Sequence, residues 1–234
     1  MIKAILFDLD NTLLDLYKLK QMAIEAAVAA MIDAGLKVSR KKIISEIDKI
    51  YKEKGIEYQK VFDDLLKRLI GKVDYKILAS GISAYRKIKN AHLDPYPTVI
   101  PTLTRLLKKG YKLGIISDAP KLQIWTRLCD TKLQHFFNFV ISAEDTKKKP
   151  SALPFRYALK ELKLKPHEVL MVGDSIEKDI IGAKKIGMKT ALARYGKVKE
   201  KIVGVKRTKE KIDVKPDFVL TKFEDILKIV EKSL

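Results

Sequence analysis

Short apolar runs and helical patterns alternate along the chain, and the first apolar run ends at two neighbouring carboxylates. Residues 2–7 are apolar apart from Lys3, and Asp8 and Asp10 follow directly. An apolar run of this length, bounded by polar residues, predicts a buried strand. In an open α/β sheet, ligands bind at the carboxyl ends of the strands. The two acids would therefore lie together at a sheet edge, where a divalent cation would relieve their repulsion.

Helical spacing replaces the strand pattern after Leu14 and continues as far as residue 94. Ser39 predicts a helix start, and Gly35, Gly55 and Gly71 predict helix ends. The predicted helices cover residues 16–30, 43–51, 61–70 and 75–89. We interpret residues 15–94 as a small all-helical domain that ends at a proline-containing hinge.

Strand and helix patterns alternate through the rest of the chain. The predicted strands are residues 111–116, 139–142, 169–172, 190–193 and 218–220. The predicted helices are residues 103–109, 122–128, 155–162, 176–186 and 223–230. This alternation indicates an α/β fold with a parallel sheet covered by helices on both faces. We expect a doubly wound, Rossmann-like core domain (1–14 and 95–234) that carries a helical cap domain (15–94) as an insertion.

Composition favours a soluble protein with a packed interior. Hydrophobic residues make up 47% of the 234 residues, and Cys129 is the one cysteine, which excludes an internal disulfide framework and fits a reducing compartment. The N-terminus lacks a signal pattern, and no uncharged apolar run approaches the ~20 residues that a membrane helix needs. We expect a cytoplasmic protein with no membrane partner, either a monomer or a homodimer. Cys129 and Trp125 are interpreted as packing residues.

The net charge of +19 has two interpretations. It could indicate nucleic-acid binding, or the lysine-rich surface of a thermophile. The basic residues are spread along the chain, and only three Asn and four Gln occur, so we favour the thermophile interpretation and expect no nucleic-acid partner. A positive field would also attract an anionic substrate. The basic stretch 197–215 is interpreted as solvated surface, with a mobile loop or a partner patch as alternatives.

Polar residues follow three further predicted strands. Ser117-Asp118 ends the strand 111–116, Lys149-Pro150 follows the strand 139–142, and Asp174 ends the strand 169–172, with Asp179 five residues later. In a parallel sheet these groups share the ligand-binding edge. Carboxylate oxygens favour Mg²⁺ over zinc, and a hydroxyl and an ammonium suit phosphate oxygens.

The chain resembles the haloacid dehalogenase-like hydrolase superfamily, in its helical-cap subfamily. Four segments in order carry the resemblance: Phe-Asp-Leu-Asp-Asn-Thr-Leu (7–13), Ile-Ile-Ser-Asp (115–118), Lys149-Pro150, and Gly-Asp-Ser-Ile-Glu-Lys-Asp (173–179). Together they span most of the chain. The third segment departs from the usual Lys-Pro-x-Pro, because Ala152 stands where the second proline is usual.

The resemblance implies a magnesium-dependent phosphatase that acts on a small phosphate ester. Asp8 would be the nucleophile that forms an aspartyl-phosphate, and Asp10 the general acid and base. Ser117 and Lys149 would hold the phosphoryl oxygens, and Asp118 would contribute to substrate binding. The Mg²⁺ ligands would be Asp8, the backbone carbonyl of Asp10, Asp174 and, directly or through its neighbours, Asp179.

Each assignment has an alternative. Ser117 could cap the following helix, Lys148 could replace Lys149, and Asp179 could be a first-turn helix acid. The superfamily also contains 2-haloacid dehalogenases, which lack the second aspartate of the pair because halide needs no proton, and sugar phosphomutases, which the sequence does not exclude. A basic nucleic-acid-binding or scaffold protein on the same fold is the alternative from a different class. We also expect the cap to open and close on hinges near 14–15 and 94–97.

Overall fold

The computed structural model describes residues 1–55, 58–196, 203 and 214–231. A six-stranded sheet forms the centre of the core, in the order β3-β2-β1-β4-β5-β6. The strands are β1 (Ala4–Phe7), β2 (Lys112–Ile116), β3 (Phe139–Ile141), β4 (Val169–Gly173), β5 (Lys189–Ala193) and β6 (Phe218–Leu220). Every neighbouring pair is parallel, so the predicted doubly wound fold is confirmed.

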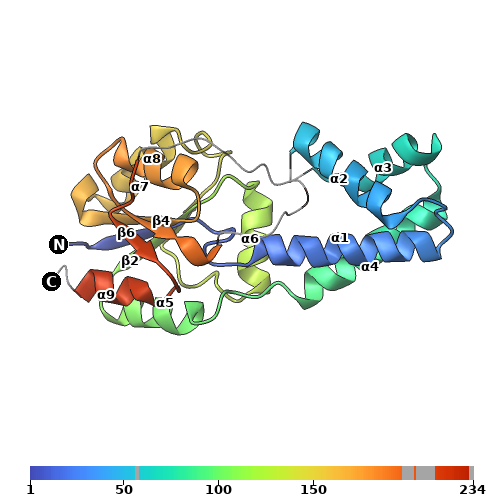
Figure 1. Cartoon of the computed structure of the whole chain (residues 1–234). Helices are drawn as coiled ribbons and strands as arrows, with labels where there is room; N and C mark the ends of the chain where they lie inside the picture. The colour runs from blue at the N-terminus through green and yellow to red at the C-terminus, as the bar shows by residue number, and fades with distance from the viewer. Residues whose placement is uncertain (56–57, 197–202, 204–213, 232–234) are drawn as a thin grey trace. The chain divides into compact units, whose positions relative to one another are not determined.

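Helices cover both faces of this sheet (Figure 1). They are α5 (Val99–Lys108), α6 (Lys121–Asp130), α7 (Ala152–Leu162), α8 (Ile181–Lys184) and α9 (Asp225–Glu231). Leu6 and Met171 point to the face that α7 and α8 cover, where Phe155 is fully buried. On the other face, Phe7 contacts the ring of Phe223, which precedes α9. Because β1 and β4 are buried on both faces, their sequences are continuous apolar runs.

The chain contacts divide the protein into two compact units. The first begins with Met1–Asp15 and resumes at Asp94, and the second contains Leu16–Leu93. The movement of residues 15–94 as a cap stays a prediction.

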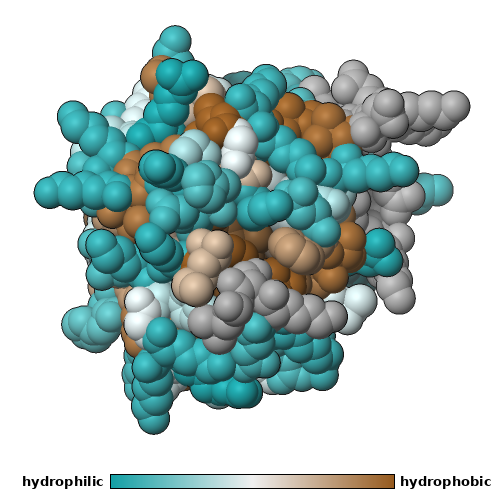
Figure 2. All heavy atoms as spheres, turned by 90° about the vertical axis from the view of Figure 1, so that its left-hand side faces the viewer, coloured by the Kyte–Doolittle hydropathy of each residue, from teal (hydrophilic) through white to brown (hydrophobic). Residues whose placement is uncertain are grey.

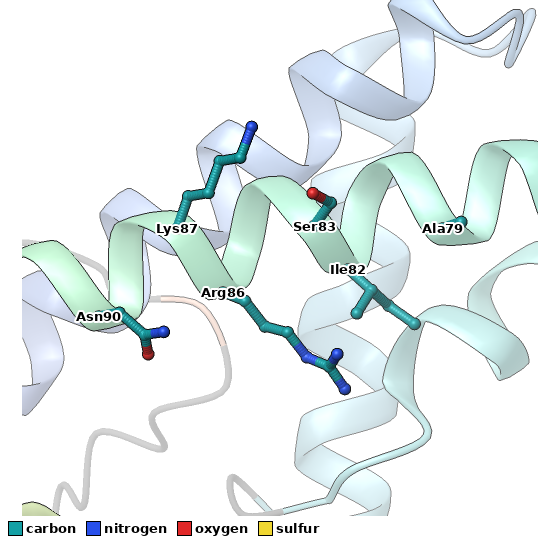
Figure 3. A pocket seen from close by; sticks show the side chains of 6 residues that line it. All are labelled: Ala79, Ile82, Ser83, Arg86, Lys87 and Asn90. Carbon is teal, nitrogen blue, oxygen red and sulfur yellow. The ribbon is translucent and has the colours of Figure 1, made fainter.

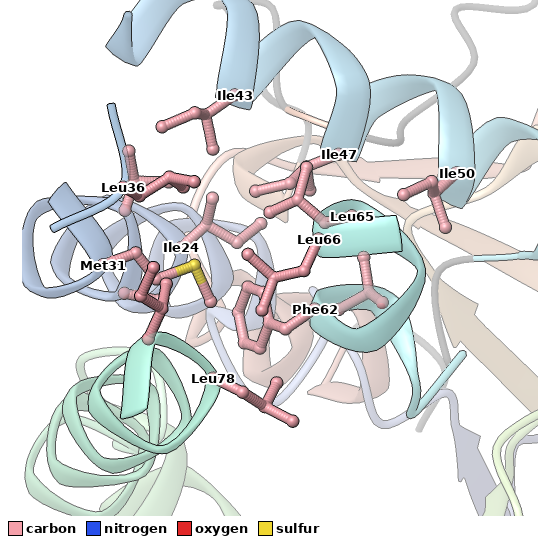
Figure 4. Close-up of a cluster of buried hydrophobic side chains, with 14 of the residues drawn as sticks. Ile24, Met31, Leu36, Ile43, Ile47, Ile50, Phe62, Leu65, Leu66 and Leu78 are labelled. Atoms are coloured by element: carbon pink, nitrogen blue, oxygen red, sulfur yellow. The ribbon is translucent and has the colours of Figure 1, made fainter. Parts of the chain in front are cut away.

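The second unit has a hydrophobic core of its own (Figure 4). Its helices are α1 (Leu16–Asp33), α2 (Arg40–Lys54), α3 (Val61–Ile70) and α4 (Tyr75–Ala91). Side chains from all four helices meet in this core, and Val203 is buried in the same cluster. The α1–α4 contact is close, since a Cβ at Gly81 would lie 2.2 Å from the Met31 Cε atom.

Two local predictions need refinement. Ser39 lies at the N-cap of α2, but its side chain makes no capping hydrogen bond. The single helix predicted over 176–186 is instead a π-helical turn, Ile176–Ile180, followed by the short α8. Gly35, Gly55 and Gly71 all have positive φ, which explains why glycine ends these helices.

The face seen in Figure 2 is largely hydrophilic, with hydrophobic side chains between the polar ones. Among the described residues, no helix combines the length and the apolar character needed to span a membrane. The basic stretch 197–215 lies outside the described residues except for positions 203, 214 and 215.

Candidate active site

The loop after β1 turns sharply, and this turn presents Asp8 at the carboxyl end of the strand. The Asp8 backbone N–H donates to the Val172 carbonyl at 2.9 Å, which continues the pairing of β1 with β4. Asn11 has φ of 60°, a left-handed conformation that asparagine tolerates, and its N–H donates to the Leu14 carbonyl at 2.6 Å. These contacts restrain the backbone of residues 8–14, which we call the nucleophile loop after the role predicted for Asp8.

Lys149 is buried and links the candidate nucleophile to a second carboxylate. Its Nζ donates to Asp8 Oδ1 at 2.6 Å, to Asp179 Oδ1 at 2.6 Å and to the Ile116 carbonyl at 3.0 Å. Lys148 is exposed, so the structure places Lys149 and not its neighbour among the candidate residues. A buried ammonium needs such partners, since an unpaired charge is costly away from water.

Three carboxylates form a tight cluster at this edge. Oxygens of Asp8, Asp174 and Asp179 all lie within 4.8 Å of one another. Asp179 reaches the cluster from the π-helical turn, and the absence of a side chain at Gly173 leaves room for it, because a Cβ there would lie 2.2 Å from Asp179 Oδ2. Asp179 is 1% exposed, so it is no solvated first-turn acid.

Burial makes the charged forms of the Asp8 and Asp174 carboxyls unfavourable. Burial raises the pKa of Asp8 from its ordinary value of 3.8 to about 7; the Lys149 ammonium lowers it, and Asp179 and Asp10 raise it further. Burial, with Asp8 and Asp179 beside it, holds the pKa of Asp174 well above its ordinary value. Burial alone would lower the pKa of Lys149, but Asp179 and Asp8 raise it, so this lysine stays charged. A cluster of desolvated carboxylate oxygens fits a hard divalent cation, which would stabilise their ionised forms.

Ser117 and Asp118 follow β2, and Asp118 contacts Lys149. The Ser117 hydroxyl accepts from the Ala119 N–H at 3.2 Å, and the N-cap of α6 is Pro120, so Ser117 does not cap that helix. Asp118 Oδ1 accepts the Lys149 backbone N–H at 2.9 Å. Asp118 thus fixes the backbone from which the Lys149 side chain extends.

The Asp10 carboxylate is not one of the three clustered carboxylates. It forms an ion pair with Arg127 on α6, with Arg127 Nη1 2.6 Å from Asp10 Oδ2. Arg127 was not predicted from the sequence as a site residue. A signal exists, since this arginine falls on the buried stripe of α6 between Ile124 and Leu128. The same stripe shows that the packing prediction for Trp125 and Cys129 is wrong, since both lie on the exposed side of that helix.

The turn Arg194–Gly196, which follows β5, is a second part of the candidate site that was not predicted from the sequence. The Tyr195 hydroxyl donates to the Thr12 carbonyl at 2.8 Å, and its ring packs edge-on against Tyr96 with centroids 5.1 Å apart. Burial raises the pKa of Tyr195, so the hydroxyl stays a donor. Gly196 approaches so closely that an added Cβ would lie 1.7 Å from the Asn11 carbonyl oxygen. This turn therefore packs against the backbone of the nucleophile loop at Asn11 and Thr12.

A pocket of about 450 Å³ lies along α4, and its lining includes none of the candidate residues (Figure 3). It is lined by Ala79, Ile82, Ser83, Arg86, Lys87 and Asn90. The Lys87 and Arg86 side chains point to opposite sides of the helix in Figure 3, so the polar groups do not converge as a ligand site requires.

Comparison with known proteins agrees with this geometry. Residues 5–193 match the family of haloacid dehalogenase-like hydrolases. A glyceraldehyde 3-phosphate phosphatase of Methanocaldococcus jannaschii is 43% identical over 201 residues, which cover 86% of this chain and 88% of that protein. A protein of the same description from Methanopyrus kandleri is 37% identical over 235 residues, covering 99% and 98%. The crystal structure of a phosphatase of this family from Thermococcus onnurineus, 26% identical, superimposes with a TM-score of 0.61 over 98% of both chains.

The chain therefore belongs to the haloacid dehalogenase-like hydrolases, and the predicted family is confirmed. Within that family its curated relatives are phosphatases, so the prediction of an enzyme that acts as a phosphatase on a small phosphorylated metabolite is confirmed as well.

Proposed function

We propose that this enzyme is a magnesium-dependent phosphatase that hydrolyses glyceraldehyde 3-phosphate or a closely similar triose phosphate through an aspartyl-phosphate. The observation that carries the proposal is the buried Asp8, which lies against Lys149 and within the carboxylate cluster at the end of β1. The two relatives described as glyceraldehyde 3-phosphate phosphatases, which match most of this chain, support the substrate.

The first step transfers the phosphoryl group to the enzyme. An Asp8 oxygen attacks phosphorus in line, an Oδ–P bond forms, and the bond from phosphorus to the ester oxygen breaks. Asp10 donates a proton to the departing oxygen, since an alkoxide is a poor leaving group. Lys149, whose ammonium contacts Asp8, and Ser117 would neutralise and orient the phosphoryl oxygens.

The second step releases inorganic phosphate. Asp10, now ionised, takes a proton from a water molecule, whose oxygen attacks phosphorus and returns Asp8 to its free carboxylate. Asp8, Asp174 and Asp179 would hold the Mg²⁺, with the Asp10 carbonyl as a further ligand. When bound, the cation supplies charge that offsets the negative phosphoryl oxygens beside an ionised Asp8.

We also propose a cytoplasmic location and a thermophilic origin for the enzyme. A single cysteine supports a cytoplasmic location. The low Asn and Gln content and a charge network on α2 and α3, in which Arg68 pairs with Glu46 and Glu53, support a thermophilic origin.

The test is release of inorganic phosphate from glyceraldehyde 3-phosphate, with Mg²⁺ and with a chelator. We expect metal-dependent turnover that falls at least ~1,000-fold in Asp8→Asn, because the nucleophile is lost. Asp130→Asn is the matched control, since Asp130 is an exposed acid on α6, and it should keep wild-type activity. Turnover that survives in Asp8→Asn would reject the aspartyl-phosphate.

A halide-release assay on a 2-haloacid and a mutase assay on a sugar phosphate belong to the same experiment. We expect no halide release, because Asp10 supplies the acid that dehalogenases lack, and no mutase activity, because the two relatives reported above are described as phosphatases. Phosphate that moves to another position of a sugar, instead of to water, would favour the mutase.

A further inference from the structure

Arg127 is a buried cation on the core side of α6. It is 6% exposed and lies between the fully buried Ile124 and Leu128. Its Nη1 donates to Asp10 Oδ2 at 2.6 Å, and its Nη2 donates to Gln123 Oε1 at 3.3 Å. Burying a guanidinium is costly unless a carboxylate or other acceptors compensate. A position on the buried stripe of a helix would ordinarily hold an apolar residue, so this arginine needs an explanation.

The ion pair joins two parts of the active site that are far apart in the sequence. Asp10 belongs to the nucleophile loop, whereas Arg127 stands on the helix that follows Ser117 and Asp118. A purely structural pair could link any two acidic and basic groups of the core. This pair instead holds the carboxylate to which the proposed mechanism assigns both proton transfers.

A general acid must face the departing oxygen, and then, as a base, face the attacking water. An aspartate side chain that rotates freely spends little time in that orientation, and a small misplacement lowers the rate. A charge-assisted hydrogen bond of 2.6 Å to one carboxylate oxygen restricts this rotation.

We propose that Arg127 is a positioning residue that orients the Asp10 carboxyl group for proton transfer to the leaving oxygen and from the attacking water. The inference rests on the proposed function, because it takes the roles of Asp8 and Asp10 from it. Arg127 itself transfers no proton.

The consequence is a dependence on the leaving group. Release of an alkoxide from glyceraldehyde 3-phosphate needs protonation, whereas p-nitrophenolate is stable enough to leave without it. Removal of Arg127 should therefore lower kcat/KM strongly for the alkyl ester and little for p-nitrophenyl phosphate. A lost fold or a lost phosphate contact would lower both alike.

The experiment measures kcat and KM on both substrates, with Mg²⁺, for Arg127→Met, Arg127→Lys, Asp10→Asn and the double variant Asp10→Asn/Arg127→Met. We expect Arg127→Met to lose ~10- to 100-fold in kcat/KM on glyceraldehyde 3-phosphate, mostly in kcat, and less than ~3-fold on p-nitrophenyl phosphate. Arg127→Lys should recover part of the loss, because it keeps a donor. The double variant should be no slower than Asp10→Asn. Arg156→Met, at an exposed arginine on α7, is the matched control without effect.

Equal losses on the two substrates, or losses that multiply in the double variant, would overturn the assignment. If Arg127→Met does not fold, as judged by its thermal melting, the same comparison on Arg127→Lys decides. Wild-type protein without turnover on either ester would reject both this inference and the proposed function. Wild-type turnover that vanishes in Asp8→Asn, with equal losses in the Arg127 variants, would reject only this inference.

Discussion

Charge at single residues governs how the active site responds to pH and to metal. Asp8, Asp174, Asp179 and Lys149 share a small buried volume, in which three negative groups face one positive group. Without a cation, the Asp8 and Asp174 carboxyls are stabilised in part by keeping protons that they would release in water. The folded protein therefore binds more protons here than the unfolded chain does.

This difference fixes the sign of a pH effect. The pKa of Asp8 is 3.8 in an unfolded chain and about 7 in the folded protein. Between these values the unfolded chain has released its proton and the folded protein has not, so the free energy of unfolding falls as pH rises through this window. Under the proposed function, Mg²⁺ would bind the ionised carboxylates and should restore the stability that is lost.

We therefore expect Mg²⁺ to raise the Tm more at about pH 8 than at about pH 5. Differential scanning fluorimetry with Mg²⁺ and with a chelator at both pH values measures this. In Asp8→Asn, the Tm of the metal-free protein should fall less with pH, because one ionising group is gone. A Tm shift by Mg²⁺ that is equal at both pH values would contradict the assignment of these carboxyls to the metal site.

The sequence was sufficient to predict the candidate site residues that follow strands. It was not sufficient to predict the residues that contact the site from distant parts of the chain. Asp8, Ser117 and Asp174 each follow a short apolar run, so their position at one edge follows from the parallel sheet alone. Arg127 meets Asp10 across 117 residues, and such an ion pair has no local pattern. Tyr195 supports Thr12 across 183 residues in the same way.

At the scale of elements, a turn and a loop are packed as one unit. The turn Arg194–Gly196 contacts the nucleophile loop in two ways. Tyr195 donates a hydrogen bond to it, and the backbone of Gly196 approaches it closely because glycine has no side chain. Backbone cannot move aside as a flexible side chain can. We therefore expect the shape of this turn to influence the positions of Asp8 and Asp10 in the same loop.

Gly196→Ala should lower kcat/KM for glyceraldehyde 3-phosphate by ~10- to 100-fold, since a shift of about 1 Å in reacting groups has an effect of that size. Its added Cβ would lie 1.7 Å from the Asn11 carbonyl oxygen, so the loop must move. Gly110→Ala is the matched control: its φ is +82° but an added Cβ meets no atom within 4 Å, so it should lose stability and keep kcat/KM. A Gly196→Ala enzyme with wild-type kcat/KM would show that the loop does not depend on this turn.

Element types were predictable because burial imposes different periods on strands and helices. The π-helical turn Ile176–Ile180 was not predictable, because the same spacing of apolar residues fits both an α-helix and a single π-helical turn. The burial predicted for Trp125 was wrong because the buried face of α6 carries Arg127. A pattern of apolar residues alone does not reveal a buried face that contains an arginine.

At the scale of the whole molecule, charge is the dominant feature. A chain with a net charge of +19 should attract a phosphate ester from a distance. Salt screens this attraction over about 8–10 Å at physiological ionic strength.

We expect kcat/KM for glyceraldehyde 3-phosphate to fall steadily as potassium chloride is added, mainly through KM, while kcat changes little. Steady-state kinetics at several salt concentrations measure this, with sucrose at equal osmolality as a control for solute effects. A kcat/KM that does not respond to salt would show that the charge does not steer the substrate. Salt-dependent binding of labelled nucleic acid at comparable strength would instead revive the nucleic-acid interpretation.

The sheet order also has a consequence for how the protein is made. β1 is central, paired with β2 from Lys112 onward and with β4 from Val169 onward, and it precedes both partners in the chain. β1 therefore lacks its first neighbour until β2 is synthesised and its second until β4 is synthesised, a situation that favours aggregation and delays folding. During that wait the helices between Leu16 and Leu93 already have neighbours close in sequence. Asp8 is thus synthesised long before Gly196, whose backbone packs against the loop that carries Asp8.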